Sequence, residues 1–445
     1  MGGAGQRRAP PTVIMAVDSH DAAASMSMTL AEKILARASR REHLRPGEIV
    51  TCHVDLAMMH DSSGPRRLAP KLAELGVDLW DPDKVVLITD HFVGETDTHS
   101  VQIQALTRDW AAKRPLRGYH EAQGICHVVL PERGHLEPGM FVVGGDSHST
   151  TGGAFGCFMT GIGATDMAGV LATGNIWMRV PETLRVRVDG VLGEGVAAKD
   201  VMLFLCHSIG INGAGYMAAE YTGSGVTAMS MDERMVLANM AVELGAKCGI
   251  VAPDDTTRDW LAKVGVQVGD AHRWQSDSDA AVASEIAIDA ADLTPRVAAP
   301  YSPENSAPVD VHAGTAIDQA YIGACTGAKL DDLRMAARVL DGRRVADGVR
   351  FFVAPASLHI ADEAEREGTL DSLRAAGATM LASACGACIG LGPARLGAGE
   401  IGISSSSRNF QGRMGDSSSQ TYLSSPYTVA ASAVAGCIAD PRGYL

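Results

Sequence analysis

The chain has 445 residues, of which 46% are hydrophobic and 20% charged, and its formal net charge at pH 7 is −14. This composition is ordinary for a globular protein with large cores, and at about 150 residues per domain the length predicts roughly three domains. A surface of this sign repels nucleic acid and anionic lipid, and no apolar stretch is long enough to span a bilayer. The same field repels an anionic substrate, so a carboxylate ligand would need a local cluster of Arg or Lys.

The N-terminal residues and the cysteines indicate where the chain works. Residues 1–25 contain only a short apolar run flanked by charged residues, which is not the pattern of a signal peptide. We therefore expect a loose extension, with the folded part starting near Met26. The nine cysteines are an odd number and no export signal accompanies them. Reduced thiols in a cytoplasm are expected rather than a disulfide framework.

The first part of the chain contains one helical pattern and several apolar runs. Residues 29–39 have apolar side chains at helical spacing and predict a helix, whereas residues 47–59 predict a strand that ends in a polar turn. The runs 84–91, 124–132 and 139–148 are each typical of a buried strand with polar residues at its C-terminal end. Ligands of open parallel α/β sheets bind at that end, so these polar residues are site candidates.

The same alternation continues to the C-terminus. Residues 182–210 predict a strand, a loop and a helix, and residues 230–255 predict a helix capped by Ser230 and followed by a strand. Residues 290–314 are rich in Pro, Ala and Ser over most of their length and predict an interdomain linker. Strands and helices alternate again beyond it. This order of elements predicts an α/β architecture.

Three cysteines in the last third give the strongest chemical signal. Cys325 follows an apolar run, and Cys385 and Cys388 form a Cys-x-x-Cys pair among small residues. Such a pair lets two thiolates face one soft metal centre, and a third Cys at another strand end completes a three-ligand site. A thioredoxin-like pair would stand early in a small domain, and a structural zinc site prefers four ligands. Inert burial suits the other six cysteines, so we favour an iron–sulfur cluster at these three.

Carboxylates and histidines gather at the predicted strand ends and near them. A His held by a carboxylate is a tunable proton donor or acceptor near neutral pH. Histidines outside such groups are expected to be ordinary core or surface residues. The candidates are two sets, Asp90 with His91 and Asp146 and Ser147 with His148, to which His127 and Glu243 are added as single residues.

Two arginines near the C-terminus could supply the local positive charge that an anionic ligand needs. Arg408 and Arg413 are spaced as two guanidinium forks on one loop that follows four serines. Each could grip a carboxylate through two parallel hydrogen bonds. Taken alone, this loop could equally be a solvated surface turn.

Together these motifs resemble the aconitase superfamily, from about residue 28 to the C-terminus. Within it, the chain looks most like the large subunits of the 3-isopropylmalate dehydratase and homoaconitase group. The order of the motifs makes the resemblance specific. Its main carriers are GMFVVGGDSHSTTGGAFG (139–156), AYIGACTGAK (320–329), ACGACIG (384–390) and SRNFQGRMG (407–415).

The resemblance implies a role for each candidate residue. Cys325, Cys385 and Cys388 would hold three irons of a [4Fe–4S] cluster, and the fourth iron would act as a Lewis acid on the hydroxyl and a carboxylate of a small hydroxy acid. Asp90 and His91 would protonate the leaving hydroxyl. The other candidates would surround them: Asp146, Ser147 and His148, with His127 paired to Glu243, at the iron-bound water and substrate; Arg408, Arg413 and Ser407 at the substrate; and Asn239 near the cluster.

The resemblance also implies the architecture and a partner. It implies three α/β/α-type domains with mainly parallel sheets around a central cleft, at residues 26–185, 186–289 and 315–445, the last carrying the cysteines. The family's Ser on a mobile fourth domain has no counterpart after residue 330. A separate small subunit would supply it in a heterodimer or heterotetramer, so the chain alone should be inactive.

Departures from the family pattern leave the substrate open. The family usually has Asn where this chain has Gly327 and where it has Ser407. The chain could act on 3-isopropylmalate, on homocitrate-type acids, or on an alkylated malate such as 2,3-dimethylmalate or 2-methylmalate.

Two hypotheses from other functional classes compete with the hydro-lyase. A cluster-sensing RNA-binding regulator is disfavoured by the charge of −14 and the lack of a basic stripe. A degenerate scaffold is disfavoured because all three cysteines, both carboxylate–His sets and both arginines are present.

Overall fold

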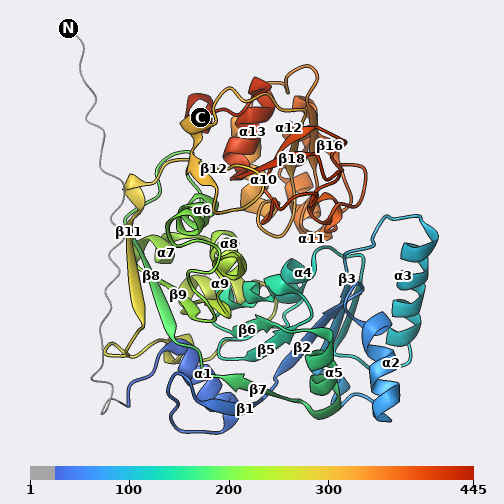
Figure 1. The fold of residues 1–445 in the computed structure, drawn as a ribbon, viewed down its shortest axis with the longest axis vertical. Helices are drawn as coiled ribbons and strands as arrows, with labels where there is room; N and C mark the ends of the chain where they lie inside the picture. Colours follow the sequence, from blue (N-terminus) through green and yellow to red (C-terminus); the bar gives the residue numbers. More distant parts are fainter. Residues whose placement is uncertain (1–25) are drawn as a thin grey trace.

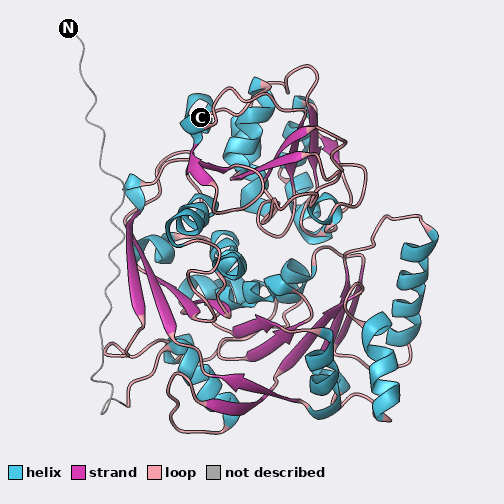
Figure 2. Cartoon of the chain, in the orientation of Figure 1, coloured by secondary structure: helices cyan, strands magenta, loops and turns pink. Residues whose placement is uncertain are grey.

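The computed structural model describes residues 26–445, so the extension expected at residues 1–25 lies outside the described residues. Helices and strands alternate along the chain, and three mainly parallel sheets form its framework (Figure 1, Figure 2). The predicted α/β fold class is confirmed. No helix within residues 26–445 is both long and apolar enough to cross a membrane.

The first sheet has five parallel strands in the order β4-β3-β2-β5-β6. Alternate residues of β2 enter different cores: Ala57 and Met59 pack with α1, α2 and α5, whereas Leu56 and Met58 pack with α4 and α8. Both faces are buried, which explains the continuous apolar runs. The elements are β2 (Leu56–His60), β3 (Val85–Thr89), β4 (Gly118–Glu121), β5 (Phe141–Gly144), β6 (Phe158–Gly161), α1 (Leu30–Ser39), α2 (Pro65–Leu75), α3 (Thr98–Ala111), α4 (Cys126–Glu132) and α5 (Ala164–Thr173).

The second sheet has four parallel strands in the order β10-β9-β8-β11. A separate antiparallel pair, β1 (Ile49–His53) and β7 (Asn175–Arg179), lies close to α1 and α5. Helix α8 begins after Ser230, whose hydroxyl accepts a hydrogen bond from Glu233 N as predicted. The elements are β8 (Thr183–Asp189), β9 (Ala218–Thr222), β10 (Cys248–Val251), β11 (Ser284–Asp289), α6 (Ala198–Ile209), α7 (Ser224–Ala228), α8 (Met231–Met240) and α9 (Asp255–Lys263).

The third sheet has seven strands in the order β13-β12-β18-β17-β14-β15-β16. Its strands are parallel except β12, which runs antiparallel to both neighbours. In Figure 1 this orange and red part of the chain sits above the blue and green part, with α4 and α11 near the boundary. The elements are β12 (Arg296–Ala298), β13 (Ser306–Pro308), β14 (Gln319–Ile322), β15 (Arg350–Val353), β16 (Thr379–Met380), β17 (Ile401–Ser404), β18 (Gln420–Ser424), α10 (Leu330–Leu340), α11 (Leu358–Arg366), α12 (Thr369–Ala376) and α13 (Pro426–Ala435).

Two local predictions were wrong. Residues 47–59 form two strands of different sheets rather than one, because the chain turns at Val54 and Asp55. Residues 124–132 form helix α4 instead of a strand: the backbone N–H of Cys126 in its first turn donates to Asp90, a contact that local sequence does not reveal. The segment 290–314, the predicted linker, contributes β12 and β13 to the third sheet. The division into domains stays a prediction.

Candidate active site

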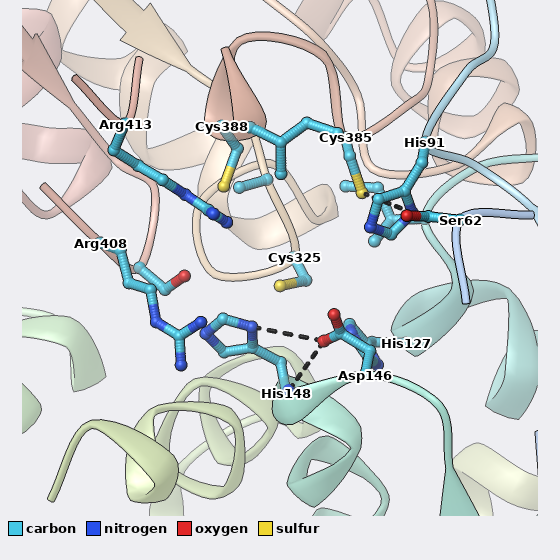
Figure 3. A pocket seen from close by; sticks show the side chains of 14 residues that line it. Ser62, His91, His127, Asp146, His148, Cys325, Cys385, Cys388, Arg408 and Arg413 are labelled. Atoms are coloured by element: carbon cyan, nitrogen blue, oxygen red, sulfur yellow. Dashed lines mark hydrogen bonds and ion pairs between the residues drawn. The ribbon is translucent and has the colours of Figure 1, made fainter. Parts of the chain in front are cut away.

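A cavity of about 310 Å³ lies where the loops of the first sheet face those of the third (Figure 3). Most of the predicted site residues line it, although they come from distant parts of the sequence. Its walls are Ser62, His91, Ile125, His127, Asp146, His148, Ala324, Cys325, Cys385, Cys388, Ile389, Ser407, Arg408 and Arg413. Asp90, Ser147, Asn239 and Glu243 lie behind this wall and contact the side chains that form it.

All three predicted cluster cysteines line this one cavity. Cys325 follows β14, and Cys385 and Cys388 lie at the 3-10 turn Gly386–Ile389 that follows β16. In Figure 3 the three sulfur atoms surround a common space. Burial raises the pKa of the Cys325 thiol to about 12, so this thiol is protonated when free, and a bound metal would have to displace its proton.

The spacing of the sulfurs does not match a single tetrahedral zinc ion. Three thiolates on one tetrahedral zinc would lie about 3.8 Å apart, as follows from Zn–S bonds of about 2.3 Å. Among residues 26–445, the groups of three or more ligand atoms within 4.8 Å of one another include none of these cysteines. Asn239 Nδ2 donates to Cys325 Sγ over 3.1 Å, which is the kind of N–H···S contact that tunes cluster sulfurs. This donor set fits a multi-iron cluster.

His91 and Asp90 form a tight pair beside the cysteines. His91 Nδ1 donates to Asp90 Oδ1 over 2.6 Å, and Cys385 Sγ lies 3.9 Å from the same nitrogen. Burial alone would lower the pKa of His91, but the attraction of Asp90, and then of Asp61, outweighs it and raises that pKa to about 9. His91 is therefore an imidazolium at neutral pH, with its ring facing the cavity.

A second chain of contacts crosses the floor of the cavity. His127 Nε2 donates to Asp146 Oδ1 and His148 Nε2 donates to Glu243 Oε1, each over 2.9 Å. The expected pairing of His127 with Glu243 is thus wrong, because His148 stands between them with its ring 6.1 Å from that of His127. Burial would raise the pKa of Asp146, but hydrogen bonds from both histidines lower it well below its usual value.

Glu243 also orients Arg408. Arg408 Nε donates to Glu243 Oε1 over 2.7 Å and its Nη1 donates to Ser147 Oγ over 3.0 Å, which leaves Nη2 without a recorded bond to the described residues. Two other predicted residues present unsatisfied polar atoms here. Within residues 26–445, Arg413 Nε and Ser407 Oγ are buried without a hydrogen-bond partner. Such groups are expected where a polar ligand supplies the partner.

Sequence reasoning missed several residues next to this site. The ring of His60 stacks on that of His91 with centroids 4.1 Å apart, and Asp61 accepts hydrogen bonds from the backbone of His91 and Phe92, each over 3.1 Å. Ser62 lines the cavity. The signal was present, because His60 ends β2 and Asp61 and Ser62 open the polar turn that follows it, one more parallel strand end.

The comparisons with known proteins decide the family. A sequence model of the aconitase family (aconitate hydratase) matches residues 32–316 and 310–436. The chain belongs to the aconitase family. Among similar members, the 3-isopropylmalate dehydratase large subunit 1 of Methanopyrus kandleri is 46% identical over 94% of this chain and 100% of its own length. The 3-isopropylmalate dehydratase large subunit of Sulfurihydrogenibium sp. is 43% identical over 94% of this chain and 96% of its own length. The probable methanogen homoaconitase large subunit of Methanothermobacter thermautotrophicus is 42% identical over 94% of this chain and 98% of its own length. The match to these members of the family therefore covers almost the whole of each chain.

Proposed function

We propose that this chain is the cluster-carrying large subunit of a hydro-lyase of the 3-isopropylmalate dehydratase type. The observation that carries the proposal is a single cavity lined by three cysteines, His91 and the two arginines. The relatives named as 3-isopropylmalate dehydratase large subunits match along their whole length and support the same activity.

The residues of the cavity can fill two roles that a dehydration reaction needs, a cluster site and a proton donor. Cys325, Cys385 and Cys388 would hold the [4Fe–4S] cluster, which when bound supplies a Lewis acid for the substrate hydroxyl. His91, charged at neutral pH and backed by Asp90, would give its proton to the departing hydroxyl oxygen. Without such a proton donor the substrate would have to release hydroxide, which is a poor leaving group.

The remaining candidates would bind and orient the substrate. Arg408, held by Glu243 and Ser147, and Arg413 would receive carboxylates, because guanidinium forks match carboxylate geometry. His127, Asp146 and His148 would line the part of the cavity that holds the water molecule and the substrate hydroxyl. Ser407 and Asn239 would complete the cavity, Ser407 toward the substrate and Asn239 toward the cluster.

We further propose that a small subunit carrying a catalytic Ser completes the site. The similar proteins are named as large subunits, and such a name implies a small-subunit partner. Homoaconitase activity is the second candidate, favoured by the similar relative that bears that name. The two activities share the reacting centre and differ in the group attached to the substrate's carbon chain.

The test combines this chain with a small subunit of the 3-isopropylmalate dehydratase type, after anaerobic reconstitution with iron and sulfide. Formation of the unsaturated acid is followed by its ultraviolet absorbance with 3-isopropylmalate, homocitrate, citrate, 2,3-dimethylmalate and 2-methylmalate in parallel. We expect turnover of 3-isopropylmalate by the pair, and none by the chain alone or by a pair carrying C388S. A preparation that binds no iron, or a pair that turns over none of these acids, contradicts the proposal.

A further inference from the structure

A buried lysine outside the predicted site connects the two loops on which the cavity depends. Lys199 lies in the first turn of α6 and is only 1% exposed. Its Nζ donates to Thr326 Oγ1 over 3.0 Å, to Ser405 O over 2.5 Å, and to Ser406 O. We call residues 323–329 the Cys325 loop and residues 405–413 the Arg408 loop, so one ammonium group contacts both.

The loops are joined at this point by further hydrogen bonds. Thr326 Oγ1 donates to Ser405 O over 3.0 Å, and the hydroxyl of Ser405 accepts from Gly323 N over 3.0 Å. Lys199 reaches this junction from α6, whose side chains pack on the second sheet and which also contacts β12 and β13 of the third sheet. A change at Lys199 would therefore act on the spacing of Cys325 and Arg408 together.

The charge of Lys199 is the unusual feature. A second buried lysine nearby, Lys329, forms an ion pair with Asp332 over 2.6 Å. Within residues 26–445, no carboxylate forms an ion pair with Lys199. A buried cation without an anion is strongly disfavoured unless something compensates for it. Burial lowers the pKa of Lys199 to about 8, and the largest opposing influences are Asp332 and then Cys325.

Thr326, to which Lys199 donates, directly follows Cys325 in the chain. If the three cysteines are thiolates bound to a cluster, as the proposed function requires, they bring negative charge into the same buried region. We infer that Lys199 is a positioning residue of the cluster site: its ammonium balances the charge of the cysteine thiolates and holds the Cys325 loop against the Arg408 loop.

The inference predicts an effect on the cluster itself, apart from turnover. K199M keeps the length and apolar stem of the side chain but removes the charge. A positive charge near a cluster favours the reduced form, so its removal should shift the reduction equilibrium about tenfold toward the oxidised form. For a one-electron couple this is a midpoint about 59 mV lower. The cluster should also lose iron to a chelator several-fold faster than in the unaltered protein.

The experiment uses the full chain, reconstituted anaerobically, with the midpoint measured by electron paramagnetic resonance during a redox titration. T326V is the matched control, because it removes a hydrogen bond of Lys199 but leaves the charge, and its midpoint should stay close to that of the unaltered protein. K199Q is a second uncharged variant in case K199M fails to fold. The melting temperature is recorded for each protein with and without the cluster.

Charge balance predicts that loading with the cluster raises the melting temperature less in K199M than in the unaltered chain. A merely structural lysine would lower the melting temperature equally with and without the cluster and leave the midpoint unchanged, and that result overturns the inference. If the unaltered chain binds no iron, the proposed function fails and this inference fails with it. Normal cluster binding combined with an unchanged midpoint in K199M and K199Q rejects the inference alone.

Discussion

At the scale of single residues, the charge state of His91 is the property that determines its use as a proton donor. Two carboxylates face it, and Asp90 is the nearer, with 2.6 Å between its oxygen and His91 Nδ1. Their attraction exceeds the effect of burial, which acts in the opposite direction. The imidazolium is therefore retained up to a pH of about 9.

D90N should narrow the pH range in which His91 is protonated. With the carboxylate charge removed, burial dominates, so the pKa of His91 falls and the proton is lost at a lower pH. We expect the alkaline limb of the pH–rate profile of the two-subunit enzyme to move from near pH 9 in the unaltered protein to lower pH in D90N. Iron content is measured in parallel, because Cys385 contacts both residues. An alkaline limb unmoved in a fully loaded D90N enzyme would rule out this role of Asp90.

Residue identity could be predicted from the sequence where a side chain has a characteristic chemistry. The three cysteines, the carboxylate–His sets and both arginines all reach the cavity or contact its wall. Pairings could not be predicted, because they depend on the register between distant segments, and so Glu243 was assigned to the wrong histidine. Lys199 gave no signal, since a lysine in an amphipathic helical pattern is ordinarily a solvated residue.

At the scale of elements, the junction of the Cys325 and Arg408 loops depends on a residue without a side chain. A Cβ at Gly327 would lie 2.2 Å from Ser405 Oγ and 2.5 Å from Ser405 O. Hydrogen bonds fix the position of Ser405, because its backbone N–H donates to Tyr321 O and its carbonyl accepts from Lys199. The Gly that departs from the family pattern is therefore a requirement of the way these loops pack here.

G327A should destabilise the protein by about 1–3 kcal/mol, the usual cost of overpacking a buried site. Urea or thermal unfolding measures the change. G169A provides the control: Gly169 lies inside α5 with nothing within 4 Å of an added Cβ, so alanine should leave stability unchanged or raise it by about 0.4–1 kcal/mol. Equal stability of G327A and G169A would show that Ser405 can move aside.

Local patterns predicted most elements but not those defined by distant partners. The helices at 29–39 and 230–240 carry their own capping residues and were found where expected. Helix α4 has no side-chain cap within its own segment, and its apolar run fits a strand as well as a helix. The strands β12 and β13 have three residues each and are recognisable only by their neighbours in the third sheet.

At the scale of the whole molecule, residues 123–125 meet residues 356–358 at one edge of the cavity. Ile125 N donates to Ala356 O over 2.8 Å and Leu358 N donates to Gln123 O over 2.9 Å. The close approach needs Gly124, whose φ is +131° and whose Cβ would lie 2.4 Å from Ser357 Cα. This contact joins the half of the cavity that carries His91 and His127 to the half that carries the cysteines.

The same contact contains a carboxyl group that makes stability depend on pH. Glu132, at the end of α4, accepts a hydrogen bond from Ser357 Oγ over 2.8 Å. Burial raises the pKa of Glu132 to about 7, well above its ordinary value. Between that ordinary value and pH 7 the folded chain binds more protons than the unfolded chain, so stability falls as the pH rises through this window.

E132Q should therefore stabilise the chain at pH 8, by on the order of 2 kcal/mol once solvent exposure is taken into account, and have little effect at pH 5. The amide keeps an oxygen for Ser357 and is never charged. Thermal unfolding at both pH values measures the difference, and E74Q, an exposed residue of α2, controls for the change in net charge. If E132Q and E74Q behave alike at pH 8, the ionisation of Glu132 does not strain the contact between the two halves. If only E132Q gains stability, the joint at this edge of the cavity carries a charge penalty under the conditions in which His91 must stay protonated.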